Sequence, residues 1–124
     1  MRTKGQVIER LGSYHGPQTM YLDYGYIIWQ TTTGENFEIL FIEVKETGQG
    51  LGVRLMKEWL TKLIKAKTLP FTSVSVTRLA SNVNAGKFYR KLGFQEYEIN
   101  GLYKVPAVFS VMSFHDLCSK LGVS

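Results

Sequence analysis

The sequence predicts an α/β fold in which helices pack on a mixed β-sheet. β-branched and aromatic residues gather in strand-like segments, and after a glycine-rich stretch at residues 48–52 the hydrophobic period changes from two to about 3.6. Helix-like and strand-like segments then alternate to the end of the chain. Segments in this order fold into a sheet covered by helices.

Length and composition fit one folded domain spanning residues 1–124. Of the 124 residues, 44% are hydrophobic and 20% are charged, as in globular proteins. No apolar run approaches the roughly 18 residues that cross a bilayer, so we expect no membrane partner. A single cysteine, Cys118, and an N-terminus without an apolar signal segment favour the cytoplasm.

The charge balance is basic, with 15 Lys and Arg against 10 Asp and Glu. A basic surface suits nucleic acid, an anionic membrane or a phosphorylated ligand. The positive charges are spread along the chain without a dense block, so we expect no nucleic-acid partner. An anionic small molecule remains a candidate ligand.

The first half of the chain is predicted to contain turns followed by two strands. Residues 1–18 are polar and indicate turns around a short apolar piece. Residues 20–31 are rich in tyrosine and isoleucine and predict a strand with a break at Gly25. Residues 37–44 predict a second strand, and the two are expected to pair as an antiparallel hairpin.

The second half is predicted to alternate between helices and strands. Apolar residues at helical spacing predict a helix from Val53 to Ile64, which ends before Pro70. A second helix is expected at 83–92, with Asn82 or Ser81 as N-cap and Gly93 at its exit. The remaining expected elements are strands at 71–77, 94–99 and 105–112 and a short helix at 116–121.

The first candidate site is the run Gly48-Gln49-Gly50-Leu51-Gly52 between a predicted strand and a predicted helix. Unpaired backbone amides and the helix dipole make a helix N-terminus a phosphate site, and glycines let the backbone come close. The run lacks the Gly-Lys-Ser/Thr ending of nucleotide-triphosphate loops and differs from the dinucleotide fingerprint. By itself it fits a phosphate site and a simple tight turn equally well.

The second motif, residues 82–94, makes the pattern specific. With the glycine run, it resembles the GNAT acetyltransferase superfamily, whose cofactor loop is Gln/Arg-x-x-Gly-x-Gly/Ala and whose later helix is Asn-x-x-Ala-x-x-(apolar)-Tyr-x-Lys-x-Gly-Phe. The resemblance covers residues 37–112, with both motifs in the family's order. The later motif is matched at Asn82, Ala85, Phe88, Tyr89, Lys91, Gly93 and Phe94.

The resemblance implies a small acetyl-coenzyme-A-dependent N-acetyltransferase that acetylates a primary amine of a small molecule or protein in a ternary complex. It also implies a mainly antiparallel mixed sheet that splays apart at the cofactor slot. No metal is expected, because His15 and His115 have no acidic or cysteine partner at ligand spacing.

The implied cofactor site follows the first motif. Amides from Gly48 to Val53 would hold the pyrophosphate, and Thr47 stands where the family has Gln or Arg, which removes one side-chain contact. Main-chain groups of Ile42 and Val44 would pair with the pantetheine arm. The full set is Ile42, Val44, Thr47, Gly48, Gln49, Gly50, Leu51, Gly52, Val53, Asn82 and Lys87, with Arg90, Lys45 and Arg54 as weaker phosphate partners.

Two residues are candidates for proton transfer. Tyr89 would protonate the leaving thiolate, since a phenol near ~10 is close to a thiol near ~8.5, although its spacing alone favours a core position. Glu38 would accept the amine proton, with ordered water as the competing base. Glu43 is an odd number of residues away and is therefore expected on the opposite face of the strand.

Two other functions remain open. The chain could be a catalytically silent acyl-coenzyme-A-binding module, or a nucleic-acid-binding module with salt-sensitive DNA affinity. Family members place a strand and two helices before the hairpin, and here fewer than twenty residues precede it. The acceptor pocket is therefore expected to be either open or completed by another subunit, and a homodimer is our hypothesis for the second case.

Overall fold

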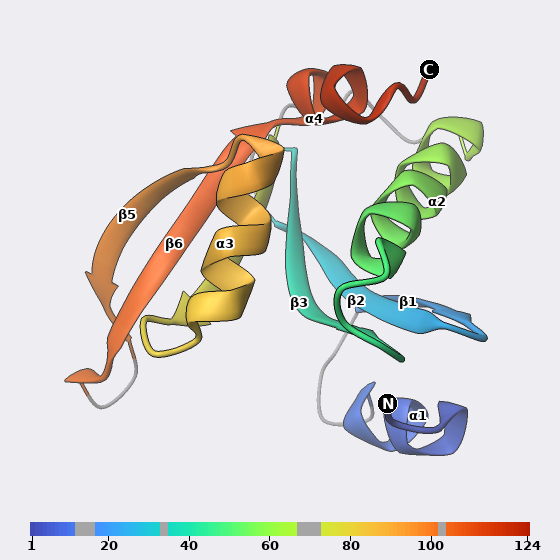
Figure 1. Ribbon diagram of the computed structural model, residues 1–124, viewed down its shortest axis with the longest axis horizontal. Coiled ribbons are helices and arrows are strands. Elements are labelled where there is room, and N and C mark those ends of the chain that lie inside the picture. Colours follow the sequence, from blue (N-terminus) through green and yellow to red (C-terminus); the bar gives the residue numbers. More distant parts are fainter. Residues whose placement is uncertain (12–16, 33–34, 67–72, 102–103) are drawn as a thin grey trace.

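The computed structural model describes residues 1–11, 17–32, 35–66, 73–101 and 104–124. In chain order the elements are α1 (Lys4–Leu11), β1 (Gln18–Leu22), β2 (Gly25–Thr32), β3 (Asn36–Val44), α2 (Leu51–Lys65), β4 (Ser73–Leu79), α3 (Val83–Leu92), β5 (Gln95–Asn100), β6 (Pro106–Ser113) and α4 (Phe114–Leu121). The side chains of α2, α3 and α4 share one core against the sheet, and α1 packs on the opposite face (Figure 1).

The strands form a six-stranded sheet in the order β1-β2-β3-β4-β6-β5. All neighbours are antiparallel except β3 and β4. The expected mixed, mainly antiparallel sheet is therefore confirmed.

The sheet splays between β3 and β4. Their parallel ladder runs from Asn36–Ser73 to Ile39–Val76 and ends there, although both strands continue. In Figure 1, β3 runs down to the right while β6, the neighbour of β4, runs down to the left, with α3 in front of the widening space. The expected splay is confirmed.

The N-terminal elements differ from the sequence prediction. Residues 4–11 form a helix instead of turns. The side chain of Val7 in this helix is 1% exposed and packs against Tyr26 and Ile28 of the sheet. Residues 20–31 belong to two strands instead of one, because the chain reverses between Leu22 and Gly25. A Cβ on Gly25 would lie 2.8 Å from the carbonyl oxygen of Glu43, so this glycine allows close approach of β3.

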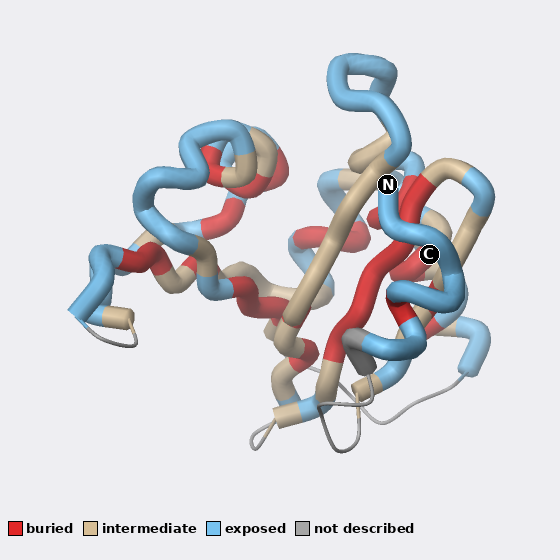
Figure 2. Tube along the Cα trace, turned by 90° about the horizontal axis from the view of Figure 1, so that it is seen from below, coloured by how far each residue is buried: buried red, intermediate tan, exposed pale blue. Residues whose placement is uncertain are grey.

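The main core lies between the sheet and α2. Trp59 of α2 packs edge-on against Trp29 of β2 and Phe37 of β3, with ring centroids 5.7 and 5.9 Å apart. Figure 2 shows that the buried residues lie in the strands and on the inner sides of the helices. Among the described residues, no helix is both long and apolar enough to cross a membrane.

The predicted helices of the second half are confirmed. Helix α2 begins two positions before Val53, and α3 has the predicted bounds, with Asn82 as N-cap and Gly93 at φ 103° as C-cap. The expected stop at Pro70, the first two residues of the strand predicted at 71–77, and His15 lie outside the described residues.

Candidate functional site

The glycine-rich loop connects Val44, the end of β3, to the start of α2. Gly48 and Gly50 have φ angles of 78° and 72°, a left-handed conformation that is costly for residues with a Cβ. A Cβ on either glycine would have no heavy atom within 4 Å. No neighbouring side chain covers the loop beside these two glycines, so their conformation and not a lack of space explains why glycine is found there.

Among the described residues, no side chain occupies the start of α2 as a cap or as a carboxylate in its first turn. Gly50 is the N-cap, no side chain caps the helix, and its first turn contains no acidic residue. The first amides of a helix have no carbonyl within the helix to which they can donate, and they lie at the positive end of its dipole. The amides of Leu51, Gly52 and Val53 therefore fit a pyrophosphate.

The two sequence motifs meet at the first turn of α2. A Cβ on Gly52 would lie 3.0 Å from Cε2 of Phe88 in α3. The Phe88 ring packs edge-on against Tyr89, with ring centroids 5.3 Å apart. Glycine at position 52 thus allows α3 to approach the start of α2, so that both motifs contribute to one region.

Asn82 caps α3 through its side chain. Its Oδ1 accepts a hydrogen bond of 3.3 Å from the amide of Ala85. The residue is exposed at the turn between β4 and α3. Because the cap engages only the amide oxygen, the Nδ2 group remains the donor with which a ligand carbonyl can bond.

Tyr89 lies on the inner side of α3 and is 2% exposed. Its ring also packs edge-on against Phe94, at a centroid distance of 5.3 Å. Burial raises the pKa of Tyr89 above the ordinary 10.0, while the positive charge of Arg78 acts in the opposite direction. The buried phenol therefore releases its proton less readily than the unperturbed phenol assumed from the sequence.

Glu38 lies on the opposite face of the sheet from Tyr89. Its neighbours Phe37 and Ile39 face α2 in the main core, and its Oε2 accepts a hydrogen bond of 3.4 Å from Nε2 of Gln30. Ile39 is the last residue of β3 that pairs with β4. The carboxylate thus stands on the α1 face, beside the point where the strands separate.

Glu43 lies on the same face as Glu38, and the expectation of opposite faces was wrong. The register between β2 and β3 shifts so that Leu40 is an extra residue in β3, and this bulge reverses the alternation of side chains. Glu43 consequently pairs with Tyr26 on the α1 face, and its Oε1 accepts a hydrogen bond of 2.8 Å from the amide of Arg2. This hydrogen bond links the Glu43 carboxylate to the N-terminal segment.

The candidate phosphate-binding cations differ in their surroundings. Arg90 donates to Glu96 at 2.8 Å, and Nε of Arg54 lies 3.6 Å from Oε1 of Glu58. Lys87 is exposed on α3, and none of the described ion pairs involves it. Lys45, which follows β3, is likewise exposed and in none of these ion pairs, so Lys87 and Lys45 are better suited to a phosphate than Arg90 and Arg54.

Sequence reasoning missed Arg78. It lies in β4 beyond Val76, where that strand has separated from β3, and its side chain is 7% exposed. Nη2 of Arg78 is 3.2 Å from Oε2 of Glu96. Because this contact depends on how the fold brings β5 and β4 together, no spacing in the sequence signals it.

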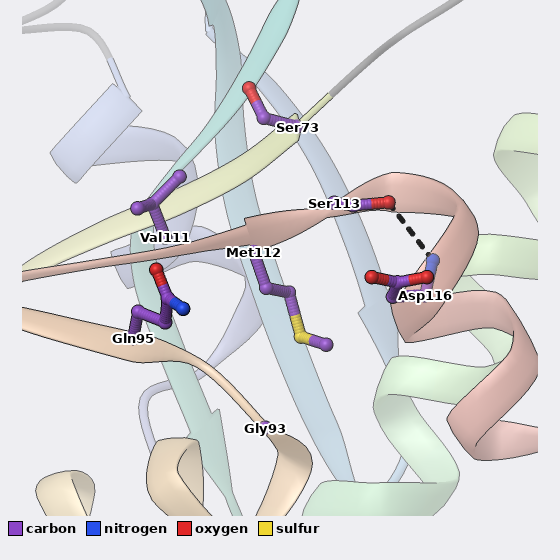
Figure 3. A pocket seen from close by; sticks show the side chains of 7 residues that line it. All are labelled: Ser73, Gly93, Gln95, Val111, Met112, Ser113 and Asp116. Carbon is purple, nitrogen blue, oxygen red and sulfur yellow. Dashed lines mark hydrogen bonds between the residues drawn. The ribbon is translucent and has the colours of Figure 1, made fainter.

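A hollow of about 410 Å³ lies between the start of β5, the end of β6 and the start of α4 (Figure 3). Oγ of Ser113 accepts a hydrogen bond of 3.1 Å from the amide of Asp116 at its rim. Ser73, which also lines it, begins β4 at the end that is still paired with β3. The hollow is therefore distinct from the splayed end of the sheet. Its lining residues are Ser73, Gly93, Gln95, Val111, Met112, Ser113 and Asp116.

No group of three or more His, Cys, Asp and Glu side chains arranged to hold a metal ion occurs within the described ranges. The residues at the splayed end instead provide amides, carbonyls and glycines. These groups fit a phosphorylated organic ligand.

Comparisons with known proteins agree with this geometry. Residues 15–96 match the family model described as the acetyltransferase (GNAT) domain. A search of curated proteins gave no match.

Several solved structures share the fold. The ribosomal-protein-S18-alanine N-acetyltransferase from Escherichia coli has a TM-score of 0.64 at 18% identity, over 92% of this chain and 79% of that one. A GNAT family acetyltransferase from Elizabethkingia anophelis with acetyl-CoA bound has a TM-score of 0.60 at 21% identity, over 90% and 83%. Ard1 from Thermoplasma volcanium has a TM-score of 0.64 at 20% identity, over 90% and 80%. Because the family model covers more than half of the sequence, the chain belongs to the GNAT acetyltransferase family.

Proposed function

We propose that this protein transfers an acetyl group from acetyl-coenzyme A to a primary amine while both substrates are bound. One observation carries the proposal: an open glycine loop and an uncapped helix start lie directly after the strand that separates from β4. An anion held at this helix start can extend its attached chain into the splay. Family membership and the acetyl-CoA bound to the Elizabethkingia structure support the choice of donor.

The donor contacts divide between backbone and side chains. Amides of the loop and first turn would hold the pyrophosphate, and Ile42 and Val44 lie in the part of β3 beyond its last pair with β4, where an added pantetheine strand fits. Nδ2 of Asn82 would donate to a pantetheine carbonyl, and Lys87 would face a phosphate. The backbone contacts involve Thr47, Gly48, Gln49, Gly50, Leu51, Gly52 and Val53.

The reaction requires that the ammonium nitrogen loses two protons and that the leaving sulfur gains one. An alkylamine titrates near ~10.4, so Glu38, directly or through water, takes one proton from it on the α1 face. The nitrogen attacks the thioester carbon, a C–N bond forms, and the C–S bond breaks with its electron pair on sulfur. Sulfur takes a proton from Tyr89, and the second proton lost by nitrogen restores the phenol. One proton is released to solvent for each ammonium acetylated.

The placement of the two residues supports these roles. Tyr89 belongs to the core beneath α3, and Glu38 stands on the other face beside the end of the β3–β4 ladder. A base for the entering amine and an acid for the leaving sulfur act on different atoms. Positions on opposite faces therefore suit a direct attack.

The test is release of coenzyme A thiol from acetyl-coenzyme A across a panel of small amines, lysine peptides and protein N-termini. Tyr89→Phe should slow turnover about 100-fold, the usual size of a general-acid contribution. Tyr21→Phe is the matched control, because Tyr21 lies in the edge strand β1, outside the splay, and its hydroxyl donates to the carbonyl of Arg2. Full activity of Tyr89→Phe would contradict the assigned role.

The alternative is a catalytically silent acyl-coenzyme-A-binding module. It predicts that acetyl-coenzyme A binds with the same dependence on the loop, while no amine in the panel accelerates thiol release. Amine-dependent release by the wild-type chain would exclude this alternative.

Two further properties belong to the proposal. Exposed Tyr97 and Ile99 on β5, 52% and 40% accessible, give an apolar surface on which a homodimer could form, and sedimentation would show whether it does. A purely monomeric protein at assay concentration would contradict the proposed dimer.

We also propose a cytoplasmic location. Cys118 is a buried free thiol, which suits the reducing cytoplasm.

A further inference from the structure

We propose that Arg78 is a positioning residue for acetyl transfer, which fixes the start of α3 and stabilises the phenolate that Tyr89 becomes when it gives its proton to sulfur. The inference rests on the proposed function, in which Tyr89 is the acid. It adds a role for a side chain that neither sequence motif contains.

The hydrogen bonds of Arg78 tie three elements together. Nη1 donates to the carbonyls of Leu79 at 3.3 Å and Asn82 at 3.2 Å, and Nη2 donates to Glu96 at 3.2 Å. One planar guanidinium thus holds the end of β4, the N-cap residue of α3 and strand β5. Movement of this group would shift the residue proposed to bind pantetheine and the helix that carries Tyr89.

The helix is shaped to accept the guanidinium. A Cβ on Gly86 of α3 would lie 2.5 Å from Nη2 and 2.7 Å from Cζ of Arg78, so any side chain at this position would displace the guanidinium. Nε of Arg78 is buried and has no hydrogen-bond partner. A buried donor without a partner costs about 1–3 kcal/mol, so Arg78 is held in place at a cost to stability.

Arg78 is also the cation that acts on Tyr89 from outside α3. Its charge lowers the pKa of the phenol against the larger effect of burial. From β5 the nearby charge is Glu96, which both Arg78 and Arg90 engage, and β6 has no ionisable side chain. The remaining charged side chains of these elements are exposed or paired at the surface: Glu98 of β5, Lys87, Arg90 and Lys91 of α3, and Lys57, Lys62, Lys65 and the Arg54–Glu58 pair of α2.

The chemical consequence follows from charge in a buried site. When Tyr89 donates its proton to the thiolate, a negative charge forms on Oη, where burial disfavours it. The positive charge of Arg78 offsets part of that penalty. Removing it should therefore lower the rate of the transfer step more than the affinity for the acetyl donor.

The first test needs no acceptor. Tyr89 is replaced by 3,5-difluorotyrosine, whose more acidic phenol titrates at an accessible pH, and the ionisation is followed by ¹⁹F NMR. Arg78→Met should raise the titration midpoint by about one pH unit, as expected for loss of a nearby opposite charge. The matched control is Arg90→Met, which removes the other cation on Glu96 and should leave the midpoint in place. Equal midpoints in the wild type and Arg78→Met would overturn the proposal.

The second test uses turnover and a double-mutant cycle. Arg78→Met should lower kcat about tenfold, the rate equivalent of one pH unit, with a smaller change in KM for acetyl-coenzyme A. In a Tyr89→Phe background, which has no phenol to ionise, the same substitution should lower kcat by much less than tenfold, because only the effect on the position of α3 remains. An undiminished effect there would show a purely structural role and overturn the proposal. If Arg78→Met does not fold, Arg78→Gln removes the charge while keeping a donor and supports the same comparison.

The two tests separate the inference from the proposed function. If wild-type protein releases no thiol with any amine, the proposed function fails, and the ¹⁹F titration still decides whether Arg78 stabilises the phenolate. If turnover depends on Tyr89 but the ¹⁹F titration midpoint is the same with and without Arg78, the proposed function stands and the inference fails.

Discussion

The two halves of the Asn82 side chain have different tasks in our account, and two substitutions separate them. Asn82→Ala removes the hydrogen bond from the Ala85 amide to Oδ1 as well as the Nδ2 donor. Loss of an N-cap costs about 1 kcal/mol, which in a domain of this size lowers the melting temperature by about 4 °C. Asn82→Asp keeps the acceptor and places a negative charge at the positive end of α3, so stability should be retained.

Coenzyme A affinity should respond differently from stability. Both substitutions remove the donor, so both should weaken binding by about 1 kcal/mol, several-fold in Kd, as measured by calorimetry beside thermal unfolding. Asn84→Asp is the matched control for added charge, because it introduces the same carboxylate in the first turn of α3 without removing the cap. If Asn82→Asp binds no more weakly than Asn84→Asp, the proposed pantetheine contact is wrong. If Asn82→Ala melts like the wild type, the cap does not stabilise α3.

Three further predictions concern stability. Gly50→Ala should cost about 1–2 kcal/mol in urea unfolding because φ is 72°, and Gly50→Asn should cost less, so equal losses would contradict a backbone origin. Gly86→Ala should destabilise by about 1 kcal/mol because it displaces Arg78, whereas the ordinary gain of a helical Gly→Ala exchange would show that the guanidinium moves freely. Burial alone would raise the pKa of Glu43, but the hydrogen bond from Arg2 and nearby positive charge lower it below its ordinary 4.5. This stabilisation is present above pH 4.5 and is lost as the pH falls through the lower pKa that Glu43 has in the folded protein. The free energy of unfolding of Glu43→Gln should therefore change less with pH in this range than that of the wild type. An equal change with pH in the two proteins would contradict this assignment.

The sequence was sufficient for elements whose signals are local. Helix α3 has its predicted bounds because the cap at Asn82, the apolar stripe and Gly93 all lie within a few residues of one another. The glycine run and the following helix were equally visible, since the change of period marks their junction. The splay was expected only from the family resemblance, and the end of the β3–β4 ladder confirms it.

Most of the features that escaped prediction depend on distant partners. Helix α1 has one fully buried described residue, Val7, and its local sequence signal is the capping box that Thr3 and Gln6 form, which was overlooked. The turn at Asp23-Tyr24 lacks the glycine or asparagine that usually marks a hairpin, and two strands therefore resembled one. The bulge at Leu40 that brings Glu43 to the face of Glu38 arises from pairing with β2.

The most direct test of the coenzyme A site is a titration of the ¹⁵N-labelled protein with coenzyme A, followed through its backbone amide signals. We expect the largest shifts at residues 48–53, with smaller shifts at Ile42, Val44 and Asn82. Gly50→Ala should weaken this response without unfolding the protein. Signals at residues 48–53 that stay unchanged at saturating coenzyme A, or shifts confined to the hollow beside Asp116, would contradict the assignment.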